Sequence, residues 1–183
     1  MLRGMPLQAI TAIGRDRPGI VAALTRELLA LGGTLADSQM SIMRGHFTVM
    51  LICELPEELE PGELDAALGR VRDGLALDVV RASPLSGDPP ERPSPTHVLS
   101  VYGSDHPGIV HHIANVLADH SVNITDVNTR VLGEEDGVPV YAMLLEVTLP
   151  RSLDPAALDN RIQAVAKELG VDASLHPADA DVL

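Results

Sequence analysis

The sequence predicts an α+β protein that contains two copies of one small unit, each ordered strand, helix, strand, strand, helix, strand. Three observations lead to this prediction. A stretch of about 75 residues recurs along the chain, apolar residues alternate or follow helical spacing within each copy, and a proline-rich segment separates the copies. Each unit is expected to form a four-stranded antiparallel sheet with both helices on one face.

The internal repeat is strongest where residues 10–21, ITAIGRDRPGIV, match residues 99–110, LSVYGSDHPGIV. Further along, FTVMLICELP at 47–56 matches YAMLLEVTLP at 141–150. The offset between the copies grows from 89 to 94 positions, so the second copy carries five extra residues, near 133–139. The chain is therefore expected to hold two homologous domains.

Between the copies, residues 83–96 read SPLSGDPPERPSPT and include five prolines. Proline has no N–H to donate to a sheet and favours extended, semi-rigid backbone. This segment is therefore predicted to be a linker outside the sheets. It divides the chain into a first domain at 1–82, a second domain at 97–176 and a C-terminal tail at 177–183.

In each unit the first strand, QAITAI or HVLSVY, is followed by a Gly-x-Asp-x-Pro-Gly turn and a helix. Pro18 suits the first helical turn, because an N–H there would have no hydrogen-bond acceptor within the helix. Asp16 is placed where its carboxylate would cap the helix. The apolar faces of the two helices share a spacing of three or four residues. They comprise Ile20, Leu24, Leu28 and Leu31 in the first copy, and Ile109, Ile113 and Leu117 in the second.

The rest of each unit supplies the other three strands and the second helix. Strand two is expected at 34–43 and 122–132, and strand three at 46–55 and 139–149, joined in the first unit by a short Arg44-Gly45 turn. The second helices carry Leu64, Leu68, Val71 and Leu75, or Leu158, Ile162, Val165 and Leu169. Strand four is expected at 77–82 and 171–175. This order gives the ferredoxin-like split βαβ fold.

Composition excludes several functions. The 13 Lys+Arg against 26 Asp+Glu give a net charge of −13, which repels nucleic-acid phosphates. Only Phe47, Tyr102 and Tyr141 are aromatic, too few for a base-stacking surface. The single cysteine, Cys53, lies in an apolar run and is expected to be a buried, inert thiol. No segment suggests a signal peptide or membrane span, so we expect a cytoplasmic protein.

The motif G-x-D-x-P-G-[IV]-V after a first strand, with Thr34-Leu-Ala-Asp37 or Asn123-Ile-Thr-Asp126 at the start of strand two, resembles the ACT domain. Two such units without an attached enzyme are similar to the glycine cleavage system transcriptional repressor family. The resemblance implies a regulatory module that binds amino acids or other small ligands at the interface between paired units, near the strand-one/helix-one turn. It also implies pairing of ACT units, as a homodimer or within one chain, which fits the small core of each unit.

Physical chemistry supports a ligand site at that turn. Free N–H groups at a helix N-terminus suit a carboxylate, and an aspartate suits an ammonium group. Glycine allows a ligand to approach the backbone. The resemblance adds the start of strand two, where Asn123 is the expected contact and Thr34 replaces it in the first unit. The candidate contacts are Gly14, Asp16, Pro18, Gly19, Ile20, Thr34 and Asp37, and Gly103, Asp105, His106, Pro107, Gly108, Ile109, Asn123 and Asp126.

Other interpretations of these residues remain open. The aspartates of the turn would also serve as plain helix caps, Asp37 and Asp126 as charges that protect an edge strand, and His106 as a solvated loop residue. Six of the seven histidines lie at or beyond 97, but their spacing predicts no metal site. No cofactor motif and no catalytic pairing occurs, so we expect no enzyme.

The sequence therefore predicts a non-catalytic regulator that binds an amino acid such as glycine or serine and acts on a partner protein, either a transcription factor or a metabolic enzyme. Direct nucleic-acid binding is not expected. One alternative is an interaction module without a ligand. Another is a regulatory relative of an enzyme such as formyltetrahydrofolate deformylase or phosphoserine phosphatase, whose N-terminal portions resemble these units.

Overall fold

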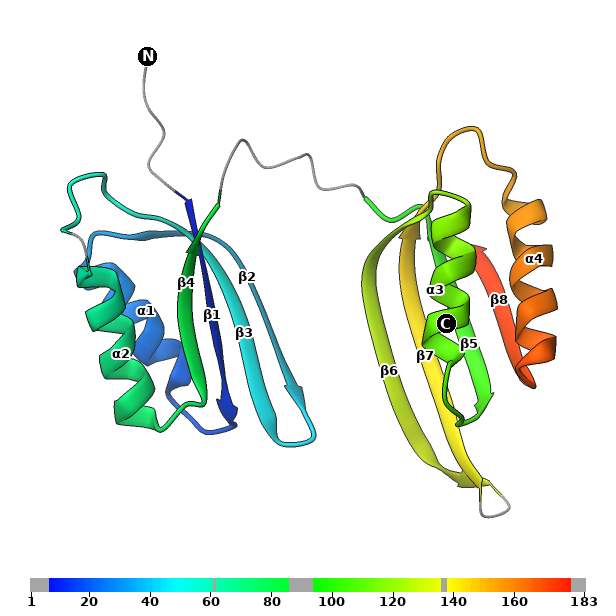
Figure 1. Ribbon diagram of the computed structural model, residues 1–183, viewed down its shortest axis with the longest axis horizontal. Helices are drawn as coiled ribbons and strands as arrows, with labels where there is room; N and C mark the ends of the chain where they lie inside the picture. Colours follow the sequence, from blue (N-terminus) through cyan, green and yellow to red (C-terminus); the bar gives the residue numbers. More distant parts are fainter. Residues whose placement is uncertain (1–6, 61, 86–93, 136–137, 179–183) are drawn as a thin grey trace. The chain divides into compact units, whose positions relative to one another are not determined.

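Each repeat builds its own sheet in the computed structural model, which describes residues 7–60, 62–85, 94–135 and 138–178. The chain divides into two compact units, Met1–Asp88 and Pro89–Leu183. Both units have the predicted order of strand, helix, strand, strand, helix, strand (Figure 1).

The first unit consists of β1 (Leu7–Arg15), α1 (Ile20–Ala30), β2 (Thr34–Met43), β3 (His46–Glu54), α2 (Glu63–Leu75) and β4 (Val79–Pro84). Its strand order is β2-β3-β1-β4, and every neighbouring pair is antiparallel. The Arg44-Gly45 hairpin turn is confirmed, with both residues at positive φ.

The second unit consists of β5 (His97–Ser104), α3 (Ile109–Asp119), β6 (Asn123–Glu135), β7 (Val138–Thr148), α4 (Pro155–Glu168) and β8 (Val171–Pro177). Its strand order, β6-β7-β5-β8, repeats that of the first sheet. The extra residues near 133–139 were predicted to extend the hairpin loop, but residues 133–135 belong to β6 and residues 138 and 139 to β7, with Glu135 opposite Val138. Residues 136 and 137 lie outside the described residues.

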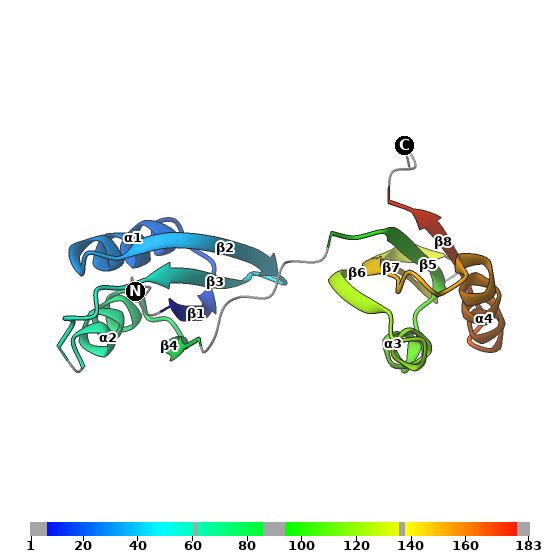
Figure 2. The same ribbon diagram turned by 90° about the horizontal axis from the view of Figure 1, so that it is seen from above.

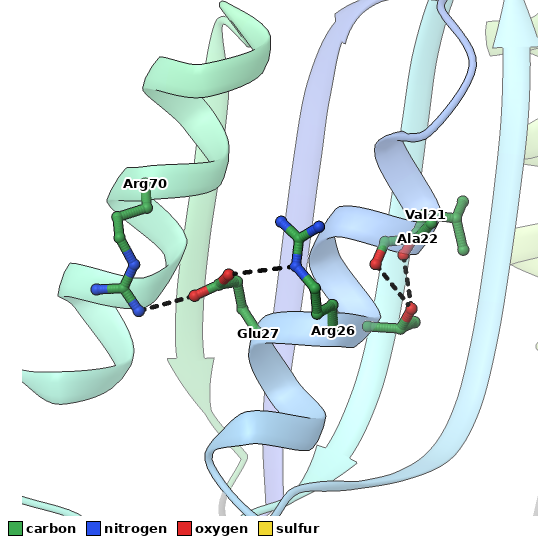
Figure 3. Close-up of polar contacts among 6 residues, drawn as sticks. Val21, Ala22, Arg26, Glu27 and Arg70 are labelled. Carbon is green, nitrogen blue, oxygen red and sulfur yellow. Dashed lines mark hydrogen bonds and ion pairs between the residues drawn. The ribbon is translucent and has the colours of Figure 1, made fainter.

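The two helices of each unit cover one face of its sheet, and the core of each unit, largely aliphatic with one aromatic ring, lies on that face (Figure 2). The predicted helix faces are confirmed for Ile20, Leu24 and Leu28 of α1 and for Ile109, Ile113 and Leu117 of α3, all of which are buried. Leu31, predicted on the first of these faces, follows the end of α1 and is half-buried. An ion pair adds to the packing of α1 on α2: Oε2 of Glu27 lies 2.7 Å from Nη2 of Arg70, and Arg26 flanks the same carboxylate (Figure 3).

The ends of the outer strands differ from the prediction. Strand β4 begins at Val79 rather than at residue 77, and Ser83 and Pro84, which were assigned to the linker, lie opposite Ala9 and Gln8 of β1. Proline is accepted here because β4 is an edge strand, so a missing N–H need not break a ladder bond. Residues 86–93 of the predicted linker lie outside the described residues.

Candidate functional site

The turn that follows the first strand of each unit is held against the neighbouring hairpin by its backbone. The N–H of Asp16 donates to the carbonyl of Gly45 at 3.1 Å, and the N–H of Asp105 donates to the carbonyl of Pro139 at 2.8 Å. Both aspartate side chains are exposed. The carboxylates are therefore presented to solvent from a backbone that is fixed at both turns.

The prediction that Asp16 caps the first helix is wrong. Helices α1 and α3 begin after Gly19 and Gly108, which adopt left-handed backbone with φ of 95° and 101°, and no side chain caps either helix. Pro18 was expected in the first helical turn, but it lies before Gly19 and outside the helix. In contrast, Asp154 caps α4 by accepting a hydrogen bond from the N–H of Ala156. The first-turn N–H groups of α1 and α3 thus have no side-chain acceptor.

The four glycines of the two turns serve different purposes. A Cβ on Gly14 would lie 2.8 Å from Leu77, just before β4, and one on Gly103 would meet Val171 at the start of β8, so these two glycines permit close approach of those segments to the first strand of each unit. A Cβ on Gly19 would meet nothing within 4 Å. Gly19 and Gly108 are required instead by their positive φ, which L-residues with side chains rarely adopt. Only this second pair borders the open helix N-terminus.

The isoleucines that follow, Ile20 and Ile109, are almost completely buried, with 1% and 2% of their surface exposed. Their side chains belong to the two cores, so only their backbone N–H groups are available to a ligand. Pro107 precedes Gly108 as Pro18 precedes Gly19, and both prolines are exposed.

The imidazole of His106 points to the opposite helix of its unit. Its Nε2 makes a short contact with the carbonyl oxygen of Leu169 at the end of α4, and its Nδ1 lies 3.3 Å from the carbonyl oxygen of Pro107. The ring therefore bridges the β5–α3 turn and the α4–β8 corner. The structure gives His106 a role in joining these segments, whereas Arg17 takes its place in the first unit.

The candidate residues of strand two lie far from the turn of their own unit. Thr34 and Asn123 are opposite Glu54 and Thr148, whereas the turns adjoin the other ends of those partner strands. Strand β2 is parallel to β1, as β6 is to β5, so the start of each lies at the end of the sheet opposite the turn. One unit alone therefore does not bring Asn123 to Asp105.

The two aspartates of strand two lie on the sheet face that the helices leave open. Asp37 is opposite Ile52, and Asp126 is opposite Glu146. Asp37 also lines a shallow pocket of about 320 Å³ on this face, together with Gln39, Ser41, Thr48, Met50 and Ile52 among others. The predicted residues therefore divide among the turn, the far end of the sheet and its open face.

Tyr141 is a residue near the turn that the sequence motif did not identify. It lies opposite Gly103 near the start of β7, beside the β5–α3 turn, and it is 8% exposed. Its buried hydroxyl has no regular hydrogen bond among the described residues. Burial raises the pKa of Tyr141, the negative charge of Asp105 raises it further, and a weaker hydrogen-bonding interaction with Thr129, too poor in geometry to count as a regular hydrogen bond, lowers it. The alignment of FTVML with YAMLL is the signal that marks this position, because Phe47 is its counterpart.

Within the described part of the chain, no three His, Cys, Asp or Glu side chains gather closely enough to hold a metal ion. No helix there combines the length and the apolar composition that crossing a membrane requires. The turn of the second unit presents the first N–H groups of α3 and the exposed carboxylate of Asp105.

A family model of the ACT domain matches residues 9–81 and residues 96–176. The chain belongs to the ACT domain family. The two matched ranges correspond to the two sheets, so the chain is a tandem of ACT domains.

The relatives of this tandem include the glycine cleavage system transcriptional repressor of Escherichia coli, which is 26% identical over 170 residues, covering 91% of this chain and 87% of the repressor. A UPF0237 protein of Methanopyrus kandleri is 36% identical over 83 residues, which are 45% of this chain and 87% of that protein. The first relative has a regulatory name and the second a family name, and neither is named as an enzyme.

Two solved structures share the tandem fold. A protein of unknown function from Galdieria sulphuraria has a TM-score of 0.75 at 24% identity, covering 95% of this chain and 99% of that chain. A proposed glycine cleavage system transcriptional repressor has a TM-score of 0.69 at 17% identity, covering 94% and 96%. At these identities the likeness establishes the fold alone.

Proposed function

We propose that this tandem ACT protein is a non-catalytic regulator that binds a small α-amino acid at the β5–α3 turn of its second unit. The observation that carries the proposal is the N-terminus of α3, which begins at Gly108 without a side-chain cap beside the exposed carboxylate of Asp105. Such a terminus attracts a carboxylate through its N–H groups and its dipole. The carboxylate of Asp105 would hold the α-ammonium group.

The name of the Escherichia coli relative directs the choice of ligand. That protein is a repressor of the glycine cleavage system, and it aligns with 91% of this chain. Glycine, or serine as a close analogue, is therefore the first ligand to test. Both are small enough to bind between backbone N–H groups and one carboxylate without an aromatic pocket.

The site is completed, in this proposal, by a second copy of the chain. Edge strand β6 exposes Val127, Val131 and Leu132 by 50%, 47% and 60%, and α3 beside it exposes Val110 by 45%. An apolar edge of this kind is an established route to strand pairing. When two copies of β6 pair antiparallel, the start of each lies beside the end of the other. Asn123 of the second copy then lies near the β5–α3 turn of the first copy. Within a single unit, Asn123 and this turn are at opposite ends of the sheet.

Ligand binding would stabilise this paired arrangement and thereby change the affinity for a partner protein, because a ligand shifts an equilibrium by its differential affinity for the two states. The partner would be a transcription factor or a metabolic enzyme in the cytoplasm. The net charge of −13 favours an effect through a protein rather than through direct contact with nucleic acid.

Isothermal titration of the full chain with each of the twenty amino acids tests the proposal. Binding of glycine or serine is expected, and the double variant Asp105→Ala/Asn123→Ala should lose it. Asp119→Ala serves as the matched control, because Asp119 is an exposed carboxylate at the other end of α3. Failure of every amino acid to bind would remove the proposal, and full affinity in the double variant would move the site elsewhere.

Pairing is tested separately by light scattering. Val127→Lys places a charge on the exposed apolar edge of β6 and should convert a dimer into a monomer that binds the amino acid more weakly. A variant that keeps the wild-type mass and affinity would contradict pairing through this edge.

A second function is favoured by the edge strand of the first unit. All ten residues of β2 are exposed, and Met40, Ile42 and Met43 expose 50%, 52% and 61% of their surface. This surface suits a protein-interaction module that needs no ligand. Such a module would capture its partner equally well with and without glycine, whereas the regulator would not.

A further inference from the structure

The two units differ at one buried position beside the turn. Phe47 of β3 lies opposite Gly14, and Tyr141 of β7 lies opposite Gly103, so the two rings occupy equivalent places. Phe47 is 2% exposed and purely apolar, whereas Tyr141 is 8% exposed and carries a hydroxyl. The second unit therefore buries a polar atom exactly where the first unit has none.

The hydroxyl of Tyr141 has no hydrogen-bond partner among the residues that the structure describes. A buried hydroxyl without a partner is costly, and it becomes useful when a ligand supplies the missing bond. Two exposed side chains act on it: Asp105 through its charge, and Thr129 through a hydrogen-bonding interaction that is the smallest of the influences on its pKa and falls short of a regular hydrogen bond. A ligand held between these exposed side chains would reach the hydroxyl by displacing the atoms that now cover it.

We propose that Tyr141 is a ligand-binding residue that restricts amino-acid binding to the second unit. This inference rests on the proposed function and adds the residue that makes the two units unequal. The hydroxyl donates its hydrogen bond to the α-carboxylate, to which the N–H groups of α3 also donate, while Asp105 holds the α-ammonium group. The first unit, with Phe47 and Thr34 in the equivalent places, binds no amino acid.

The direction of this hydrogen bond follows from the surroundings of Tyr141. Burial and the charge of Asp105 both raise the pKa of its hydroxyl, so it keeps its proton at neutral pH. The hydroxyl is then a donor to an anionic acceptor, and the ligand group that it meets is an acceptor such as a carboxylate. A cationic ligand group would be held by Asp105 and not by Tyr141.

Titration of the full-length wild type, Tyr141→Phe and Tyr102→Phe with glycine and L-serine tests the inference. Tyr141→Phe should weaken binding by about tenfold or more, the effect of one hydrogen bond to a charged group. Tyr102 is the other tyrosine, 48% exposed on the open face of β5, and Tyr102→Phe should bind as the wild type does. One amino acid per chain is the expected stoichiometry.

The outcomes separate the inference from the proposed function. A wild type that binds neither glycine nor serine nor any other amino acid overturns both. A wild type that binds, together with Tyr141→Phe of equal affinity, overturns the role of Tyr141 and leaves the proposed function standing. Two ligands per chain would overturn the restriction to the second unit.

Tyrosine fluorescence supplies a second measurement that does not depend on how well Tyr141→Phe folds. The chain has no tryptophan and only two tyrosines, so Tyr141 is the sole tyrosine of the Tyr102→Phe variant. Glycine binding should change the tyrosine emission of this variant with the same concentration dependence as the titration heat. Emission that stays constant while glycine binds would overturn the contact.

Discussion

Val171 at the start of β8 occupies the space that a side chain on Gly103 would need. A Cβ at position 103 would lie 2.8 Å from Cγ1 of Val171 and 2.9 Å from its Cα. The first unit repeats this relationship, since a Cβ on Gly14 would lie 2.8 Å from Leu77 and 3.1 Å from its backbone. The first glycine of each motif therefore lets the segment between the second helix and the last strand of its unit pack directly against the first strand.

Gly103→Ala is expected to destabilise the second unit by about 1–3 kcal/mol, the usual cost of forcing a methyl group into packed structure. The contact includes backbone, so a side-chain rotation alone does not relieve it. Urea unfolding followed by circular dichroism measures the change. Gly69→Ala is the control, because Gly69 lies within α2 with nothing near its Cβ position, and alanine should raise stability there by about 0.5–1 kcal/mol. Equal stability of Gly103→Ala and the wild type would contradict the packing role.

Asp154→Ala should lower the free energy of unfolding by about 1 kcal/mol, because the carboxylate of Asp154 caps α4 through the N–H of Ala156. Asp105→Ala should change stability by less than about 0.5 kcal/mol, because Asp105 caps no helix. The same urea titration compares the two variants. If Asp105→Ala costs as much as Asp154→Ala, the carboxylate has a structural role at the turn that its position does not explain.

Much of the fold follows from local patterns in the sequence. The spacing of Ile20, Leu24 and Leu28 defines a helix face by periodicity alone, and the Arg44-Gly45 pair defines a hairpin by its turn chemistry. The end of β4 does not follow from such patterns. Whether Pro84 joins a sheet depends on its lying in an edge strand, and the position of a strand within a sheet is a long-range property.

The candidate site was predictable only in part. The motif identifies Asp105 and Gly108, which stay together because they are neighbours in the chain. The sequence motif groups Asn123 with the residues of the turn in one candidate site. Because β5 and β6 run parallel, however, the start of β6 lies at the end of the sheet that is far from the turn. Tyr141 is 36 residues from Asp105 in sequence, and its missing hydrogen bond is visible only once side chains are placed.

Stability should fall at alkaline pH through the single thiol. Cys53 is completely buried, and burial raises its pKa above the ordinary value of 9.0. Above that value the unfolded chain releases the thiol proton while the folded chain retains it, so unfolding is favoured as the pH rises through the folded pKa. Urea midpoints between about pH 8 and pH 10 should therefore fall less steeply in Cys53→Ala than in the wild type. Identical slopes would show that the thiol ionises equally in both states.

Tyr141→Phe should stabilise the ligand-free protein by about 1 kcal/mol, because it removes a buried hydroxyl that lacks a partner and so avoids its desolvation cost. Phe47 shows that the equivalent place of the first unit accepts phenylalanine without exposure. Tyr102→Phe, on the open sheet face, should leave the unfolding midpoint unchanged. The two changes remove the same atom, so their difference measures the burial of one hydroxyl. A lower midpoint for Tyr141→Phe would mean that the hydroxyl is already hydrogen-bonded in solution, for example to Thr129, and that a ligand gains nothing by replacing that bond.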